Sequence, residues 1–133
     1  MEFAELIQKA KEAKEQAYAP YSGFHVGAAL LCKDGTIFTG CNIENSAYGP
    51  TNCAERTAIF KAVSEGFREF EAIAIISDSK QPTAPCGVCR QVMAEFCDPD
   101  SFFIVVAESE SDYEIRTLRK LLPEGFGSEN LAD

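Results

Sequence analysis

Hydrophobic residues recur along the chain with two spacings, one typical of helices and the other of buried strands. Near the N-terminus, in 2–17, apolar residues fall close to every third or fourth position with charges between them, which predicts an amphipathic helix. Short apolar runs follow, separated by turn signals rich in Gly, Pro and Asp. The expected helices are 2–17, 54–65, 85–96 and 118–122, and the expected strands are 24–32, 36–41, 72–77, 102–107 and 113–117.

The resulting order, α-β-β-α-β-α-β-β-α, is typical of a layered α/β domain. A tight turn at 33–35 predicts that the first two strands are antiparallel. The link at 108–112 is too short for a crossover, so the last two strands are also expected to be antiparallel. With 133 residues and no repeat, linker or low-complexity tract, the sequence predicts a single domain over 1–133.

Composition and charge narrow the class of function. The net charge of −9, from 21 acidic and 12 basic residues, repels phosphate backbones, so a free nucleoside or other small polar molecule is favoured over a nucleic acid. The sequence contains no run of 18 apolar residues, so it predicts no membrane span. The N-terminal segment is charged throughout and lacks the apolar centre of a signal peptide, which predicts a cytoplasmic protein.

Four residues carry the candidate chemistry. Cys86 and Cys89 have the C-x-x-C spacing that lets two thiolates bind one zinc ion, and Cys53 supplies a third. Three protein ligands leave the fourth tetrahedral position open for water, which distinguishes a catalytic zinc site from a closed structural one. Glu55, two residues after the first ligand, completes the pattern of the zinc deaminases, in which a glutamate moves protons.

Both ligand segments are expected where helices begin. Thr51 or Asn52 is the expected N-cap of the second helix, and Pro85 suits the first turn of the third. Two helix N-termini would then point their positive ends at one site and favour thiolate over thiol. Cys53 and Glu55 can face one pocket at a helix start, although residues two apart in the middle of a helix cannot.

Three thiolates and one zinc dication sum to a charge of −1, which weakens the metal as a Lewis acid. Arg56 shares the first turn with Cys53, and hydrogen bonds from its guanidinium to the sulfurs would offset that charge. Arg90 follows the third ligand directly, and surface statistics favour a solvated helix residue there.

The remaining cysteines and the single histidine have simpler interpretations. His25 is expected as a partly buried strand residue, and a Cys–His hydrolase that used it would leave the C-x-x-C motif unexplained. A structural zinc module would supply a fourth ligand close to Cys53, and none is there. Without a secretory signal, disulfides are disfavoured. The residues expected as buried free thiols are Cys32, Cys41 and Cys97.

Longer segments resemble the small cytidine deaminases of nucleoside salvage; they are 18–30, 40–48, 52–56, 85–91 and 121–126. The resemblance implies a three-layer, cytidine-deaminase-like α/β fold with a five-stranded mixed sheet packed between helices. It also implies one zinc ion per subunit and hydrolysis of cytidine and deoxycytidine to uridine and deoxyuridine with release of ammonia. The alternative is a zinc deaminase of another aminated heterocycle, such as a nucleoside antibiotic. Which of the two nucleosides is preferred does not follow from the sequence.

The resemblance further implies roles for single residues. Cys53, Cys86 and Cys89 would bind zinc, and Glu55 would shuttle protons. The residues expected to bind substrate are Phe24, Asn42, Glu44, Tyr48, Ala54 and Phe126.

Among these substrate residues, Asn42 and Glu44 would hydrogen-bond the ribose, and Phe24 would pack on the base or sugar. Tyr48 and Phe126 would come from neighbouring subunits of a homotetramer with shared active sites. The alternatives are a core position for Phe24 and a turn-forming role for Asn42 and Glu44.

Overall fold

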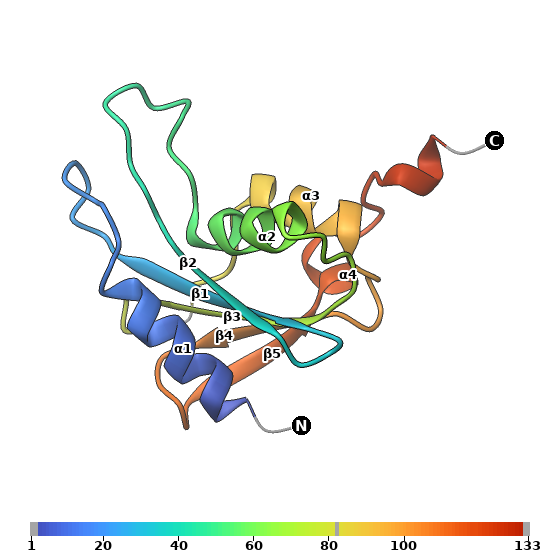
Figure 1. Cartoon of the computed structure of the whole chain (residues 1–133), viewed down its shortest axis with the longest axis horizontal. Coiled ribbons are helices and arrows are strands. Elements are labelled where there is room, and N and C mark those ends of the chain that lie inside the picture. Colours follow the sequence, from blue (N-terminus) through green and yellow to red (C-terminus); the bar gives the residue numbers. More distant parts are fainter. Residues whose placement is uncertain (1–2, 82, 132–133) are drawn as a thin grey trace.

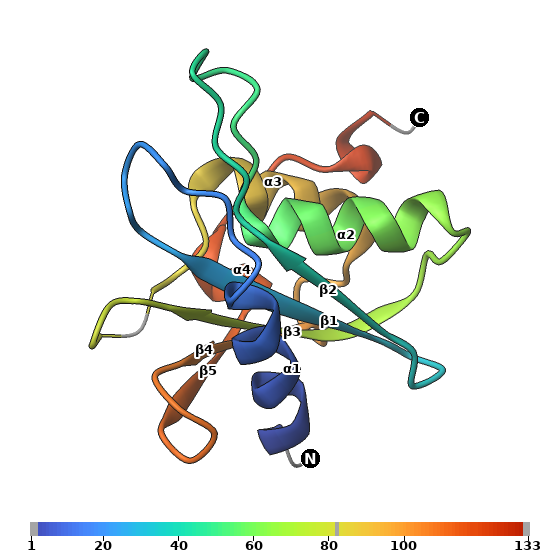
Figure 2. The same cartoon turned by 60° about the vertical axis from the view of Figure 1, so that its left-hand side comes forward.

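The computed structural model describes residues 3–81 and 83–131, and its centre is one five-stranded sheet (Figure 1). The strands are β1 (Val26–Cys32), β2 (Ile37–Cys41), β3 (Phe70–Ser77), β4 (Phe103–Ala107) and β5 (Tyr113–Thr117), and the helices are α1 (Ala4–Lys14), α2 (Ala54–Ser64), α3 (Gly87–Phe96) and α4 (Leu118–Leu121), with a 3-10 helix at Ser128–Asn130. Helix α1 lies on one face of the sheet, and α2 and α3 lie on the other (Figures 1 and 2). These three layers confirm the predicted fold class and the predicted order of the elements.

The strands lie in the order β2-β1-β3-β4-β5. β1 pairs antiparallel with β2, and β4 pairs antiparallel with β5, so both sequence predictions about strand direction are confirmed. β1 also pairs antiparallel with β3, whereas β3 and β4 are parallel. The parallel pair is possible because α3 lies between these two strands in the sequence and makes the crossover.

Alternate side chains of the central strand β3 face different helices. Ile73 and Ile75 are buried in the cluster that contains Ile59 of α2, whereas Ala74 is buried with Ile7 of α1. Because successive residues of a strand point to opposite faces, a strand covered on both sides must be apolar at nearly every position. This explains why β3 reads as a continuous apolar run in the sequence.

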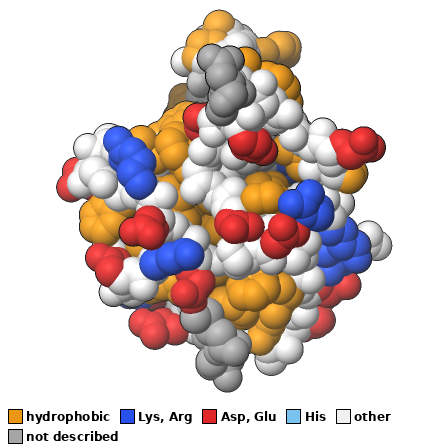
Figure 3. Space-filling view, turned by 90° about the vertical axis from the view of Figure 1, so that its right-hand side faces the viewer, with side chains coloured by type: hydrophobic (Ala, Val, Ile, Leu, Met, Phe, Trp, Pro, Cys, Tyr) orange, Lys and Arg blue, Asp and Glu red, His pale blue; other side chains and the backbone are white. Residues whose placement is uncertain are grey.

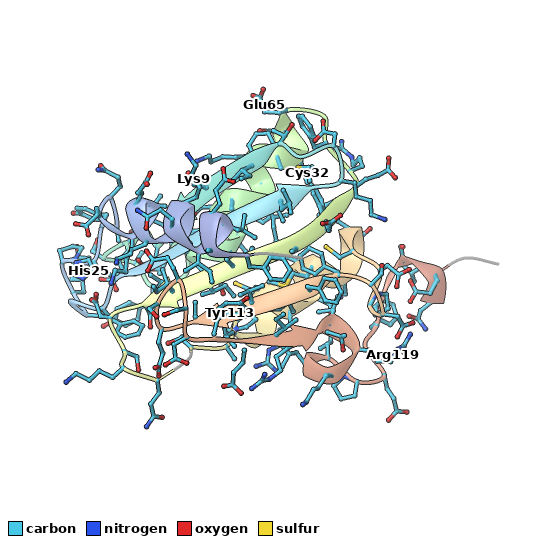
Figure 4. The ribbon with its side chains drawn as sticks, turned by 90° about the horizontal axis from the view of Figure 1, so that it is seen from below. Lys9, His25, Cys32, Glu65, Tyr113 and Arg119 are labelled. Carbon is cyan, nitrogen blue, oxygen red and sulfur yellow. The ribbon has the colours of Figure 1, made fainter. Side chains whose placement is uncertain are left out.

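Aromatic rings fix the start of α1 against one side of the sheet. The ring centroid of Phe3 lies 6.3 Å from that of Phe103 and 6.4 Å from that of Tyr113, both in edge-to-face geometry. Figure 4 is drawn from the α1 side and shows Tyr113 on the strand beyond the helix, with His25 and Arg119 at opposite ends of the molecule. The sheet end that carries His25 is also the end where the loops after α1 and β2 meet.

A glycine in β2 lets the strand approach α2 closely. A Cβ atom added to Gly40 would lie 2.5 Å from the backbone oxygen of Ala54 and 2.6 Å from the backbone nitrogen of Ala58. Contacts below 3 Å to backbone atoms cannot be relieved by a side-chain movement, so glycine is required here. The close approach holds the first turn of α2 against the sheet.

The structure corrects two predictions about helix starts. Helix α3 begins at Gly87 with Cys86 as its N-cap, so Pro85 precedes the helix instead of standing in its first turn. Cys53, not Thr51 or Asn52, is the N-cap of α2, and its side chain makes no capping hydrogen bond. Thr51 Oγ1 instead accepts a bond from the Asn45 N–H at 3.1 Å, and Asn52 Nδ2 donates to Thr57 Oγ1 at 3.1 Å. Thr51 is thus bonded to the preceding loop, and Asn52 is bonded to Thr57 of α2. Capping preferences consider only the local sequence and do not predict these partners.

Arg90 is also placed differently from the prediction. It is half-buried rather than solvated, and its guanidinium donates to the backbone oxygens of Pro85 and Leu121, each at 2.8 Å. Leu121 is 31 positions away, so this contact depends on the packing of α4 against α3. Arg90 therefore joins the start of α3 to the end of α4.

Several element ends differ from the predicted ones by a few residues. α1 ends at Lys14 rather than at 17, and β3 begins at Phe70 rather than at 72. The expected first residue of α1, Glu2, lies outside the described residues.

Among the helices of 3–81 and 83–131, none has the length and apolar character needed to cross a membrane. Acidic and basic side chains are interspersed on the face shown in Figure 3.

Candidate active site

Three cysteine sulfurs lie together where α2 and α3 begin. Cys53 is the N-cap of α2, Cys86 is the N-cap of α3, and Cys89 lies in the first turn of α3. Their three sulfurs all lie within 4.8 Å of one another, with 3.7 Å between Cys53 and Cys86 and 3.4 Å between Cys86 and Cys89. The two helices lie on the same face of the sheet (Figures 1 and 2), and this packing brings together ligands that are 33 positions apart.

The surroundings of the cluster favour a negative charge on sulfur. The Cys89 thiol and the Arg56 guanidinium both donate hydrogen bonds to Cys53, and these bonds lower the pKa of Cys53 to about 5. Arg56 Nη2 lies 3.3 Å from Cys53 Sγ. The pKa of Cys89 is raised, because its thiol proton is held by Cys53 and because the residue is buried. The surroundings therefore favour the thiolate form of Cys53 beside the Arg56 cation.

Two features of the cluster fit a zinc ion. Three soft sulfur donors within reach of one point are the donor set that zinc prefers. In addition, the Nε atom of Arg56 is buried and has no hydrogen-bond partner among the described residues. A cluster with all three cysteines ionised around a dication would keep a net charge of −1 but offer this donor three thiolate acceptors instead of one. The residues present therefore suit zinc with three protein ligands.

Glu55 is the second residue of α2 and lies beside the cluster. Its side chain is almost fully buried, with 4% of the residue exposed, and the burial raises its pKa to about 7. A buried carboxyl group with a pKa near neutrality can accept and release a proton at physiological pH. Cys53 and Glu55 line the same cavity, as expected for a cap residue and a first-turn residue.

This cavity, of about 230 Å³, is the candidate substrate site. Of the sequence-predicted substrate residues, it brings together Phe24, Asn42, Glu44 and Ala54. Phe24 is 38% exposed, so the alternative of a core position is wrong. A cavity with one aromatic wall and a few polar groups is typical of a small-molecule site.

The side chains of Asn42 and Glu44 have partners within the protein. Asn42 Nδ2 donates to the Phe24 backbone oxygen at 2.8 Å, and Asn42 Oδ1 accepts from the Val26 N–H at 2.9 Å. Glu44 Oε1 accepts from the backbone N–H groups of the 21–22 segment at 3.0 and 3.1 Å. Both side chains thus shape loops, and an amide or carboxylate keeps further hydrogen-bond sites beyond these.

Two predicted substrate residues lie apart from the cavity. Tyr48 is 86% exposed near the tip of the long loop between β2 and α2, which projects from the body of the molecule (Figure 1). Phe126 is 56% exposed in the C-terminal segment, where its backbone oxygen accepts a bond from Gln91 Nε2 at 2.7 Å. Neither aromatic residue lines the cavity of its own chain.

Six residues that line the cavity were not predicted as site residues, namely Val26, Thr51, Asn52, Ile75, Thr83 and Ala84. Ile75 comes from the carboxyl end of β3, and Thr83 comes from the loop that follows it. Thr83 Oγ1 lies 2.6 Å from Ser77 Oγ, so the loop is tied to the end of the strand. Ile75 near the end of a central strand and Thr83 just after it could have been predicted as site residues, since ligand sites of open α/β sheets lie at the carboxyl ends of strands.

The other cysteines and the histidine take no part in the cavity. Cys32 and Cys97 are buried free thiols, and burial raises their pKa values to about 11 and about 12. Cys41 is half-buried, which corrects the expectation of full burial. His25 lies just before β1 and pairs with Asp78 Oδ2 at 2.7 Å.

A helix-covered mixed sheet with three clustered thiols and a buried carboxyl group at two helix starts defines a zinc-dependent deaminase. The family model of the cytidine and deoxycytidylate deaminase zinc-binding region matches residues 2–105. The chain belongs to this family, which confirms the resemblance to the cytidine deaminases, the predicted enzyme class and the predicted zinc cofactor.

Individual relatives agree with this assignment. The chain is 56% identical over 132 residues to a cytidine deaminase from Sporosarcina psychrophila, a match that covers 99% of this chain and 96% of the relative. The structure matches a crystal structure of cytidine deaminase from Burkholderia pseudomallei with a TM-score of 0.89 and 49% identity, covering 95% of this chain and 100% of the other. A blasticidin-S deaminase from Bacillus cereus is 33% identical over 127 residues, which is 90% of this chain and 88% of the relative.

Proposed function

We propose that the protein hydrolyses free cytidine and deoxycytidine to uridine and deoxyuridine with release of ammonia. The observation that carries the proposal is the position of Glu55, buried beside three clustered thiols in the wall of a cavity that Phe24, Asn42 and Glu44 also line. The relative at 56% identity is a cytidine deaminase, whereas the deaminase of a nucleoside antibiotic matches at 33%. The antibiotic alternative is therefore less well supported.

In this proposal Cys53, Cys86 and Cys89 hold one zinc ion per subunit. The ion, when bound, supplies Lewis acidity that lowers the pKa of a water molecule. Glu55 accepts a proton from the water that adds to C4 of the base and delivers a proton to ring N3. It then takes the second proton from the oxygen added at C4 and gives it to the departing amine, so that the C4 carbonyl forms, ammonia leaves and Glu55 returns to its starting carboxylate state.

Arg56 has a separate task in this proposal. Its Nη2 lies 3.3 Å from Cys53 Sγ, and its positive charge offsets the excess negative charge of three thiolates. A carboxylate or neutral side chain at this position would leave that excess uncompensated.

The substrate residues surround the place where a nucleoside would lie. Phe24 offers an aromatic face to the base or sugar, and Ala54 borders the same cavity beside Glu55. Asn42 uses one donor and one acceptor within the protein, and this leaves one N–H and one lone pair for ribose hydroxyls. Glu44 is an acceptor for hydroxyl protons.

The direct test is ammonia release from a substrate panel by the zinc-loaded protein. We expect release from cytidine and deoxycytidine, and little from adenosine, free cytosine or the antibiotic blasticidin S. Adenosine carries a two-ring base that is larger than the base of cytidine, and cytosine lacks the ribose that Asn42 and Glu44 would bind. Fully zinc-loaded protein that releases no ammonia from either cytidine or deoxycytidine would refute the proposed function.

We also propose that the enzyme is a homotetramer with shared active sites, located in the cytoplasm. Tyr48 and Phe126 are exposed and lie outside their own chain's cavity, which supports contributions to a neighbour's site. An open cavity in a domain of 133 residues needs cover to exclude water from a nucleoside. The reduced thiols of the zinc cluster are suited to a reducing compartment.

Subunit mixing tests the sharing of active sites. Inactive Glu55→Gln subunits and inactive Phe126→Ala subunits, combined by co-expression, should regain part of the wild-type activity. The reason is that one site of the mixture can combine Glu55 from one subunit with Phe126 from another. Ammonia release per purified oligomer measures the effect, and light scattering gives the assembly size.

The control for this mixture is Glu55→Gln combined with Cys89→Ala, two defects that lie in the same chain's site. That pair should stay inactive. Activity in neither mixture would place Phe126 in its own chain's site, and a fully active monomer at micromolar concentration would remove the tetramer from the proposal.

A further inference from the structure

Two loops meet at the mouth of the cavity and are joined by backbone hydrogen bonds. The Tyr18 N–H donates to the Asn42 oxygen at 3.0 Å, and the Glu44 N–H donates to the Tyr18 oxygen at 2.8 Å. The loop after α1 therefore runs beside the first residues of the loop after β2, as Figure 2 also shows. These backbone bonds fix where the Glu44 backbone lies but not how its carboxylate is turned.

The orientation of the Glu44 carboxylate is set by three donors from one short segment. Its Oε1 accepts from the Tyr21 N–H at 3.0 Å and from the Ser22 N–H at 3.1 Å. Its Oε2 accepts from the Ser22 hydroxyl. An ionised carboxylate offers about four lone-pair sites, so these bonds leave about one for a further donor.

Ser22 is itself held in a defined orientation. Its Oγ accepts a hydrogen bond from the Phe24 N–H at 3.0 Å, which engages a lone pair and leaves the hydroxyl proton for Glu44. Gly23, between them, has a φ of 71°, in the left-handed region that favours glycine. The turn thus places a single hydroxyl between the carboxylate of Glu44 and the backbone of Phe24, and both of these residues line the cavity.

We propose that Ser22 is a positioning residue for the substrate's sugar. Its hydroxyl, anchored by the Phe24 N–H, turns the Glu44 carboxylate so that the remaining lone pair of an oxygen is presented to a ribose hydroxyl. The inference rests on the proposed deamination of nucleosides, and it assigns to Ser22 an action through Glu44 rather than direct contact with the reacting atoms. Ser22 lines a neighbouring hollow that shares Glu44 and Thr51 with the cavity, and its hydroxyl is bonded to the Glu44 carboxylate that both hollows share.

A purely structural link between the two loops is the competing explanation. In that case the loss of the Ser22 hydroxyl would loosen the cavity wall and weaken the binding of every nucleoside equally. The positioning role instead predicts a loss that depends on the sugar hydroxyls of the substrate. Substrates with and without those hydroxyls therefore separate the two explanations.

The experiment compares Ser22→Ala with the wild-type enzyme on cytidine and on 2′,3′-dideoxycytidine. We expect the KM for cytidine to rise by about 10-fold, the scale of one charge-assisted hydrogen bond near the surface. The KM for the dideoxy substrate should change by no more than about 2-fold, because Glu44 has no sugar hydroxyl to bind there. The kcat for cytidine should also stay within about 2-fold, since Glu55 and the thiols are unchanged.

Three further variants complete the design. Ser22→Thr keeps the hydroxyl and should restore most of the affinity for cytidine. Ser64→Ala removes a hydroxyl that also makes a hydrogen bond, at the far end of α2, and should leave both KM values unchanged. Glu44→Gln combined with Ser22→Ala should raise the KM for cytidine little more than Glu44→Gln alone, because both changes act on one interaction.

The outcomes distinguish this inference from the proposed function. A wild-type enzyme that releases no ammonia from cytidine would refute the proposed function. An active wild-type enzyme, with a Ser22→Ala variant whose KM rises equally on both substrates or on neither, would overturn the positioning role alone. If Ser22→Ala fails to fold, Ser22→Cys gives the same comparison, since a thiol keeps the size of the side chain but is a weak donor.

Discussion

Glu55→Gln should reduce turnover of cytidine by about 10²- to 10⁴-fold, the usual contribution of one acid–base group. The amide has almost the shape of the carboxyl group but cannot carry protons between water and the base. Zinc content should remain at the wild-type level, because the three cysteines are unchanged. Ammonia release under saturating cytidine, together with metal analysis of the same preparation, measures both quantities.

The same substitution should not lower the thermal stability. Glu55 is buried with its pKa raised by desolvation, so the folded protein disfavours the charged form, and a neutral amide removes that cost. Glu65→Gln at the C-terminal end of α2 is the matched control, because it makes the same chemical change on the same helix at an exposed position. Near-normal turnover of the Glu55→Gln enzyme would remove Glu55 from the proposed mechanism.

Cys89→Ala should weaken zinc binding by at least about 10²-fold and abolish deamination with it. Only two cysteine ligands would remain of the three that the cluster supplies. Metal content after dialysis against a weak chelator, measured per subunit, should fall from about one zinc ion to a small fraction. Cys53→Ala and Cys86→Ala should behave in the same way.

The control for the metal measurement is Cys97→Ala. Cys97 is the C-cap of the helix that carries Cys89, and it is a buried free thiol. Its replacement should leave zinc content and turnover unchanged while lowering the melting temperature slightly through lost packing. Full zinc content in all three ligand variants would refute the ligand assignment.

The candidate chemistry was accessible from the sequence because it depends on short spacings. The C-x-x-C motif and the interval between Cys53 and Glu55 both lie within single helical turns, where local geometry decides which atoms can meet. The same holds for the strand directions, since a turn or a short link allows only an antiparallel pair.

Predictions that involved longer distances were less successful. Arg90 was expected in solvent because its neighbours in the sequence do not show that α4 packs beside it. Thr51 and Asn52 were expected as caps because both have capping side chains, but their hydrogen bonds go to Asn45 and Thr57. In each case a competing partner, in a loop or a distant element, offered the polar group a better bond than the local pattern suggests.

The sequence by itself determined the candidate ligands and the order of helices and strands, because short motifs and periodicity encode them, and its resemblance to the cytidine deaminases indicated the family and the class of reaction. The starts of α2 and α3 were expected at one site, and the structure places them there. Only the tertiary structure decided that β3 lies between β1 and β4 and that Glu55 is buried with a raised pKa. It also decided that Ser22 and Glu44, 22 positions apart, share a hydrogen bond beside Phe24. The physical reason is that these features depend on packing between residues far apart in the chain, and the burial and hydrogen bonding that result are properties of the assembled core rather than of any local segment.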